Sequence, residues 1–167
     1  MEMKFEKLTK EQYAWVGIRL VLGWTLIWAF FDKLFGLGYS TLSSKSWLNG
    51  GSPTAGYLKG ATGLFSGFYH GLSGNTGVDV LFMAGLLLIG GALILGIGTK
   101  ISGYSGALLM LLLWSSNVPP KTNPIVDDHI VYFILFLVMT VVKPGRWLGL
   151  GQWWSNTPLV KRFPILE

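Results

Sequence analysis

The chain has 167 residues, of which 51% are hydrophobic and 13% are charged, with a formal net charge of +5 and no cysteine. An average soluble domain has about a quarter charged residues, so this composition predicts an integral membrane protein with a single domain over residues 1–167. The absence of cysteine excludes disulfide exchange, cysteine-ligated iron–sulfur clusters and cysteine-based structural zinc sites.

Four apolar runs follow one another along the chain, each close to the roughly 20 residues that a helix needs to cross the hydrocarbon core. They cover residues 14–37, 78–98, 101–116 and 125–142. Pro124 and the pair Lys143-Pro144 bound the last run, as expected for a residue that rarely occupies a helix interior. The pattern predicts an all-α fold, namely an integral membrane four-helix bundle. The charged N-terminal segment is predicted to be retained, because the first run is longer than the apolar part of a signal peptide.

Lysine and arginine gather at one end of these runs, which orients the bundle by the positive-inside rule. The predicted cytoplasmic set is Lys4, Lys7, Lys10, Lys100, Lys143, Arg146, Lys161 and Arg162, and the predicted outer set is Lys45, Lys59 and Lys121. Both termini are therefore expected to be cytoplasmic in a multi-pass protein of the cell membrane, with residues 143–167 as a cytoplasmic tail. No nucleic acid partner is expected, because the basic residues form no patch with interleaved aromatics.

The predicted outer loop, residues 38–77, is too long to be a simple connection between spans. Its second half, residues 57–72, places apolar side chains on one helical face, which predicts a short interfacial or re-entrant helix. His70 in this half is interpreted as an exposed histidine. Asp79, which follows the loop, is interpreted as an acid at the N-terminus of the second span.

The first half of this loop contains the string NGGSPT, in which backbone amides of Gly50-Gly51 stand between polar side chains. Successive N–H groups can form an anion-binding nest, so Asn49, Ser52 and Thr54 are candidate ligands for an oxyanion. Short strings of this kind are also common in ordinary loops, and this second interpretation stays open.

Arg19, Asp32 and Lys33 lie in a run that is apolar enough to enter a bilayer, where a charged side chain needs a partner. In a helix, Arg19 and Lys33 share a face but are separated by roughly 21 Å along the axis. Trp24, Trp28 and Asp32 form a separate stripe at i, i+4 spacing. Arg19 is interpreted either as snorkelling to the cytoplasmic interface or as a ligand-binding residue, and Asp32 with Lys33 fits a structural ion network or a site.

Asp127, Asp128 and His129 stand at the start of the last run. Helical spacing lets Asp128, His129 and Tyr132 face one way, whereas Asp127 is explained by the helix dipole alone. One interpretation is helix capping with an interfacial histidine. The other is a proton-handling cluster in which Asp128 orients His129, because histidine titrates near neutral pH.

Several segments together carry a family resemblance. They comprise Arg19-Leu20, Gly23-Trp24, Trp28, residues 32–38, residues 45–54 and Asp128-His129-Ile130. In these segments, which extend over most of the chain, the sequence resembles the DoxD-like membrane proteins of the DoxX superfamily. The resemblance implies a four-helix membrane subunit, associated in archaeal members with thiosulfate:quinone oxidoreductase, which oxidises thiosulfate to tetrathionate and passes electrons to membrane quinone.

The expected cofactor is therefore membrane quinone, and the expected partners are membrane lipid, a second oxidoreductase subunit and further copies of the chain. No metal or haem is expected, because the chain has two histidines and only one lies beside a predicted span. The expected catalytic residues are His129, Asp128 and Asp32. The expected substrate-binding residues are Lys33, Lys45, Ser46, Asn49, Ser52, Thr54 and Arg19, and the expected quinone-binding residues are Trp24, Trp28 and Trp47.

A second hypothesis stays open beside this one. The same charges would suit a non-catalytic four-helix membrane protein that binds or passes a small anion or a lipid-like ligand. A conduit needs a continuous polar path, whereas the second and third runs have few polar residues at mid-depth.

Overall fold

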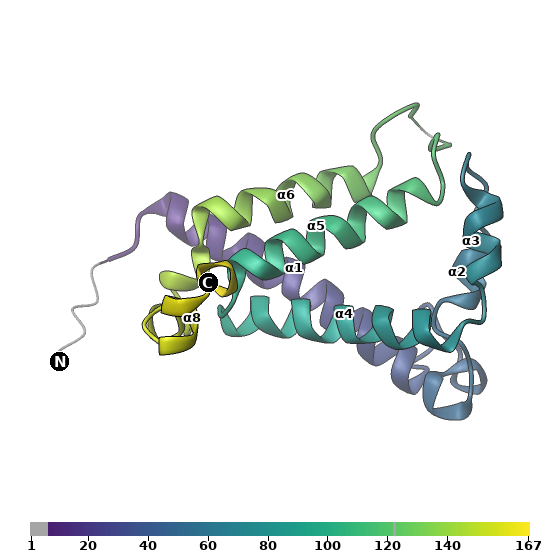
Figure 1. Cartoon of the computed structure of the whole chain (residues 1–167), viewed down its shortest axis with the longest axis horizontal. Coiled ribbons are helices and arrows are strands. Elements are labelled where there is room, and N and C mark those ends of the chain that lie inside the picture. Colours follow the sequence, from purple (N-terminus) through teal and green to yellow (C-terminus); the bar gives the residue numbers. More distant parts are fainter. Residues whose placement is uncertain (1–6, 122) are drawn as a thin grey trace.

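The computed structural model describes residues 7–121 and 123–167, and this part of the chain is all-helical, without strands. Four long helices, α1 (Lys10–Phe35), α4 (Thr76–Leu95), α5 (Thr99–Ser115) and α6 (Asp128–Val142), run alternately up and down (Figure 1). Each of them overlaps one of the four predicted apolar runs. The prediction of an all-α fold is confirmed.

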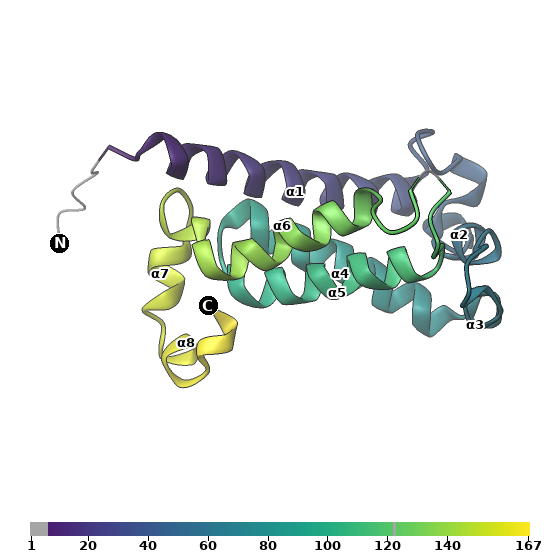
Figure 2. The ribbon, with the colours of Figure 1, turned by 90° about the horizontal axis from the view of Figure 1, so that it is seen from above.

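Short elements cover the two ends of the long helices (Figures 1 and 2). At one end lie α2 (Ala55–Lys59) and α3 (Ser66–Leu72), together with two 3-10 turns over Ser43–Lys45 and Trp47–Asn49. At the other end lie α7 (Gly151–Ser155), α8 (Pro158–Arg162) and the 3-10 turns Pro144–Arg146 and Pro164–Leu166. The predicted tail is thus a folded cap on the end of the bundle where α1 begins.

Local signals in the sequence account for the helix ends. The Thr9 side chain accepts a hydrogen bond from the Gln12 N–H, and the Gln12 side chain accepts one from the Thr9 N–H, which forms a capping box before α1. Asn75 caps α4 in a similar way by accepting from two backbone N–H groups. Both helices end at glycines in the left-handed conformation, Gly36 (φ 70°) and Gly96 (φ 73°), which a residue with a Cβ rarely adopts.

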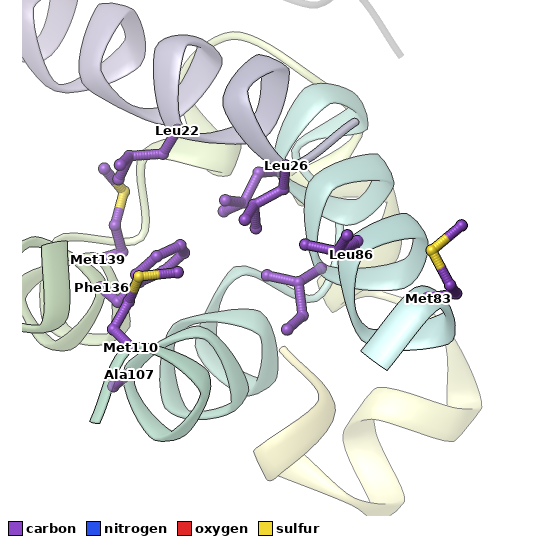
Figure 3. Close-up of a cluster of buried hydrophobic side chains, with 10 residues drawn as sticks. Leu22, Leu26, Met83, Leu86, Ala107, Met110, Phe136 and Met139 are labelled. Atoms are coloured by element: carbon purple, nitrogen blue, oxygen red, sulfur yellow. The ribbon is translucent and has the colours of Figure 1, made fainter. Parts of the chain in front are cut away.

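The long helices pack as two pairs, α1 with α4 and α5 with α6, and α4 joins the pairs by its contact with α5. Glycine permits both close crossings, because a Cβ on Gly90 would lie 3.0 Å from the Gly23 carbonyl oxygen, and one on Gly103 would lie 2.7 Å from the Phe136 carbonyl oxygen. Gly103 is therefore a position of close contact between α5 and α6. Leucine, methionine and phenylalanine side chains from all four helices fill the core, where Leu22 and Met139 point toward each other (Figure 3).

Replacing Gly103 by valine is expected to destabilise the protein by about 1 to 3 kcal/mol, because the added side chain overpacks the α5–α6 crossing. The decrease should appear as a lower thermal midpoint in detergent, followed by tryptophan fluorescence. Gly85→Val is the matched control, since a Cβ at Gly85 on α4 meets no atom within 4 Å. Equal midpoints for the two variants would contradict the close crossing.

Two helices, α1 with 26 residues and α4 with 20 residues, are long and apolar enough to cross a membrane. The other two long helices have 17 residues (α5) and 15 residues (α6), and α6 is apolar along its length. At 1.5 Å per residue, these shorter helices span roughly 22 to 26 Å, below the roughly 30 Å of a typical hydrocarbon core. By length and composition, two helices thus suggest a membrane protein, and crossing by all four stays a prediction.

The predicted single helix over residues 57–72 is divided into α2 and α3, so this prediction is wrong in detail. The chain between them is held to the segment after α5, where the Leu64 N–H donates to the Val118 carbonyl at 2.8 Å. A Cβ on Gly63 would lie 2.5 Å from the Val118 backbone nitrogen, so this approach requires glycine. A contact distant in sequence therefore overrides the local apolar pattern.

Candidate functional site

A cleft of about 140 Å³ lies between α1, α5 and α6, where the backbones of α1 and α6 are not closely packed. Its lining is Leu22, Thr25, Leu26, Met110, Leu113, His129, Tyr132 and Phe136. A dry cavity of about 150 Å³ with a similar lining is large enough for benzene, so the space fits one six-membered ring. The cleft is apolar except for Thr25, His129 and Tyr132, the few polar groups that would orient a ligand.

His129 lies in the first turn of α6, and its side chain contacts that of Asp127, the residue just before that helix. Its Nδ1 lies 2.9 Å from Oδ2 of Asp127. Because a carboxylate only accepts, we assign the proton to Nδ1, which leaves Nε2 of the neutral imidazole as an acceptor. The two side chains are 29% and 19% exposed, so the pair is screened from bulk water only in part.

Asp127 is also the N-cap of α6, because its Oδ1 accepts from the backbone N–H groups of His129 and Ile130. Partial burial raises the pKa of the Asp127 carboxyl, but the hydrogen bonds from His129 and Ile130 outweigh it, so its pKa lies below the ordinary value. The carboxylate thus stays ionised at neutral pH and fixes the orientation of the imidazole.

A second, open hollow of about 290 Å³ adjoins the same pair and is lined by residues 126–129 and Val131. His129 is therefore shared by a polar hollow on the outside and an apolar cleft inside the bundle. An imidazole in this place can exchange a proton with water on one side and with a bound ring on the other.

From helical spacing, Asp128 was expected to be the partner of His129 and Asp127 to have no role, but Asp127 is the residue that contacts the imidazole. Asp128 is exposed, and its side chain makes no recorded hydrogen bond to a described residue. The i, i+4 rule applies inside a helix, whereas Asp127 precedes it with an extended backbone (φ −127°, ψ −174°) that directs its side chain over the first turn. The sequence did contain a signal for this contact, namely an aspartate at the N-cap position two residues before the histidine.

Asp32 is buried, and both carboxylate oxygens accept hydrogen bonds from the turn after α1. The donors are the Tyr39 N–H at 3.2 Å, the Ser40 N–H at 3.0 Å and the Ser40 hydroxyl at 2.6 Å. Lys33 is half-buried, with its Nζ 3.5 Å from the same hydroxyl. The recorded contacts of Asp32 therefore serve the local turn, and none joins it to His129 within the described residues.

Asp79 occupies the place at which the sequence suggested an oxyanion. Its Oδ1 accepts from the Ser52 hydroxyl at 2.9 Å, the Thr54 hydroxyl at 2.5 Å and the Thr54 N–H at 3.2 Å. Asp79 is in the first turn of α4, as predicted, and is also buried. The donors predicted to bind an external anion thus bind a carboxylate of the chain itself.

The other predicted loop ligands point to different partners. Asn49 donates to the Ser43 carbonyl at 2.8 Å, and Lys45 is exposed. The Ser46 hydroxyl is buried without a recorded partner. These side chains lie in one compact turn, but none is recorded in contact with His129.

The three tryptophans predicted to hold quinone do not line the cleft. The rings of Trp24 and Trp28 contact each other in a tilted arrangement with centroids 5.7 Å apart, and Trp24 is 56% exposed. At 100° per residue, Trp24 lies about 160° around α1 from Leu26, which does line the cleft. Trp47 packs against the hydrophobic core from the loop.

Arg19 is buried, 1% exposed, beneath the tail at the opposite end of the bundle from the loop. Its Nη2 donates to the Leu148 carbonyl at 2.5 Å, while Nε and Nη1 have no recorded partner. A Cβ on Gly149 would lie 3.0 Å from Nη1, so a glycine-containing tail covers the guanidinium. The side chain therefore holds the tail against α1, which differs from snorkelling into water and separates it from the other predicted substrate ligands.

Comparisons with known proteins identify no relative of this chain. No family model matches the chain, and no curated protein and no solved structure is significantly similar to it.

Proposed function

We propose that this chain is a multi-pass membrane subunit of a quinone-linked oxidoreductase, with quinone bound in the cleft between α1, α5 and α6. The observation that carries the proposal is the His129–Asp127 pair at the polar edge of that apolar cleft. Quinone reduction takes up protons together with electrons, so a histidine held by a carboxylate beside the ring supplies what the reaction needs. Space for a single ring supports the assignment.

In this proposal all four long helices cross the membrane, and both termini are cytoplasmic. α5 and α6 are shorter than a typical core is thick, and a locally thinned bilayer accommodates such helices at modest cost. The cap of α2 and α3 then lies at the outer surface, and the tail lies at the inner one. The cleft between α1 and α6 would open to lipid, from which a quinone enters.

The electron donor in this proposal is thiosulfate, and it follows from the resemblance to the DoxD-like proteins. The Ser52 and Thr54 hydroxyls donate to Asp79, so they are not available to bind this anion. Lys33 and Lys45 are then the predicted ligands that would attract it by charge. A second subunit would complete the donor site. The test is reduction of a soluble quinone analogue by the purified chain with thiosulfate, alone and with candidate partner subunits.

Replacing Thr25 by tryptophan is expected to weaken binding of a soluble quinone analogue about tenfold or more. Thr25 lines the cleft yet is exposed, so a large side chain would fill the space without disturbing the core. Calorimetric titration of the detergent-solubilised protein measures the dissociation constant. Trp24→Ala tests the alternative site at the tryptophans and should leave the dissociation constant unchanged. Weaker binding in Trp24→Ala, with unchanged binding in Thr25→Trp, would instead assign the quinone to the tryptophans.

The second candidate function is a non-catalytic protein that binds a lipid-like ligand. The apolar lining of the cleft favours it, whereas the carboxylates of Asp127 and Asp128 at the adjoining hollow disfavour a small anion. A lipid carrier would bind acyl chains in the cleft irrespective of His129. Binding of a quinone analogue and of a fatty acid is therefore compared in the native chain and in His129→Ala. If the two ligands compete and only the quinone analogue loses affinity in the variant, the cleft is a quinone site.

A further inference from the structure

The end of the bundle formed by α7, α8 and the following turn presents a basic surface. Lys161 and Arg162 are exposed and make no recorded ion pair with a described residue. The Glu167 carboxylate, by contrast, is engaged by Lys143 and Arg146. At the opposite end, four lysines are matched in number by four aspartates, two of which are buried, namely Lys33, Lys45, Lys59 and Lys121 against Asp127, Asp128 and the buried Asp32 and Asp79.

Large apolar side chains are exposed among these cations. Trp153 is 64% exposed, Leu159 48% and Phe163 47%, while the Arg162 guanidinium stands over the Phe163 ring at 5.4 Å. Aromatic rings mixed with arginine and lysine are typical of the interfacial layer of a bilayer. The rings lie among the lipid headgroups there, and the charged groups reach outward to the water.

The fold holds this surface in a fixed shape. Val160 of α8 is buried, and the Trp154 indole N–H donates to the Leu166 carbonyl at 2.6 Å. The Lys100 N–H at the start of α5 donates to the Glu167 carbonyl at 2.5 Å, which ties the tail to the bundle. α7 and α8 thus lie folded at the end of the long helices (Figure 2), and the exposed Lys161 and Arg162 belong to α8.

We infer that this tail surface, defined by Trp153, Leu159, Lys161, Arg162 and Phe163, binds the anionic phospholipid headgroups of the leaflet on its side of the membrane. The inference rests on the proposed insertion of the bundle. Charge complementarity selects the occupant, because lysine and arginine next to a bilayer are attracted by negatively charged lipids. The aromatic and aliphatic side chains enter the headgroup layer beside them.

The experiment uses the full chain in liposomes that contain brominated phosphatidylglycerol or, at equal bromine content, brominated phosphatidylcholine. Bromine quenches nearby tryptophans, and the contribution of Trp153 is the difference between the native chain and Trp153→Phe. We expect stronger quenching of Trp153 by phosphatidylglycerol, and we expect parity between the lipids in Lys161→Gln/Arg162→Gln or at high salt. The matched control Lys59→Gln/Lys121→Gln, at the opposite end, should keep the preference.

Equal quenching of Trp153 by the two lipids in the native chain would overturn the inference, and so would loss of the preference in the control. Resistance to alkaline extraction, together with binding of the quinone analogue, reports on the proposed function separately. An inserted, quinone-binding chain without lipid preference would refute the tail surface alone. A chain that is extracted by alkali, with Trp153 unquenched, would refute both the insertion and the tail surface.

Discussion

His129→Ala should lower the rate of quinone-analogue reduction by about 10²–10⁴-fold, the usual contribution of a positioned acid–base group. The imidazole borders the cleft and is oriented by Asp127 at 2.9 Å, so its removal deletes the proton-transfer group and leaves most of the ring-binding lining intact. The rate is followed by quinone absorbance in the thiosulfate assay. His70→Ala is the control, because the His70 Nε2 is bound to the Ala61 carbonyl at 2.9 Å in the outer cap.

A pair of isosteric variants tests which carboxylate serves the histidine. Asp127→Asn keeps a good N-cap but replaces the ionised partner of His129, so the rate should fall, whereas Asp128→Asn should leave it nearly unchanged. An equal fall in both variants would show that only the summed negative charge matters. Full activity in His129→Ala would refute the assignment of the cleft as the site of proton transfer.

Asp79→Ala should destabilise the protein by about 3 kcal/mol or more and release the outer loop. The substitution removes one charged acceptor and leaves the buried Thr54 N–H and hydroxyl, as well as the Ser52 hydroxyl, without it. We expect a lower thermal midpoint and faster proteolysis within residues 50–75. Both follow from loss of the connection between the loop and α4.

Asp128→Ala is the matched control, since Asp128 is also an acid in the first turn of a long helix. Removing it costs only the interaction with the helix dipole, about 0.3 to 1 kcal/mol. The difference between the two variants therefore measures the loop contacts of Asp79. Similar midpoints and cleavage rates for both would contradict the anchoring role of Asp79.

The composition and periodicity of the sequence suffice to predict four apolar helices and an all-α fold, because these depend on local properties. Helix ends are equally local, as Gly36 and Gly96 illustrate. The prediction for residues 57–72 was wrong in detail, because α2 and α3 are separated where Gly63 packs against Val118, a contact that no local pattern contains. Membrane crossing by four helices stays a prediction, as two of them meet the length that a span requires.

The candidate site, too, could be predicted from the sequence only in part. His129 was selected from the sequence because a histidine beside acids at a helix start is chemically conspicuous, and it does border the cleft. Its partner depends on the non-helical backbone of Asp127, which helical spacing does not describe. The role of Asp79 depends on the path of a loop that brings residues 52 and 54 to it across the sequence.

The sequence by itself thus determined the helical segments, the apolar composition that suits a membrane and a histidine that borders the cleft. Tertiary structure alone decided that the cleft lies at Leu22, Thr25 and Phe136 rather than at the tryptophans, and that the tail covers Arg19. The physical reason is that helix propensity and hydrophobicity act over one or two turns. A site between helices depends on which faces pack, and the close approaches at Gly90 and Gly103 set that arrangement through contacts distant in sequence.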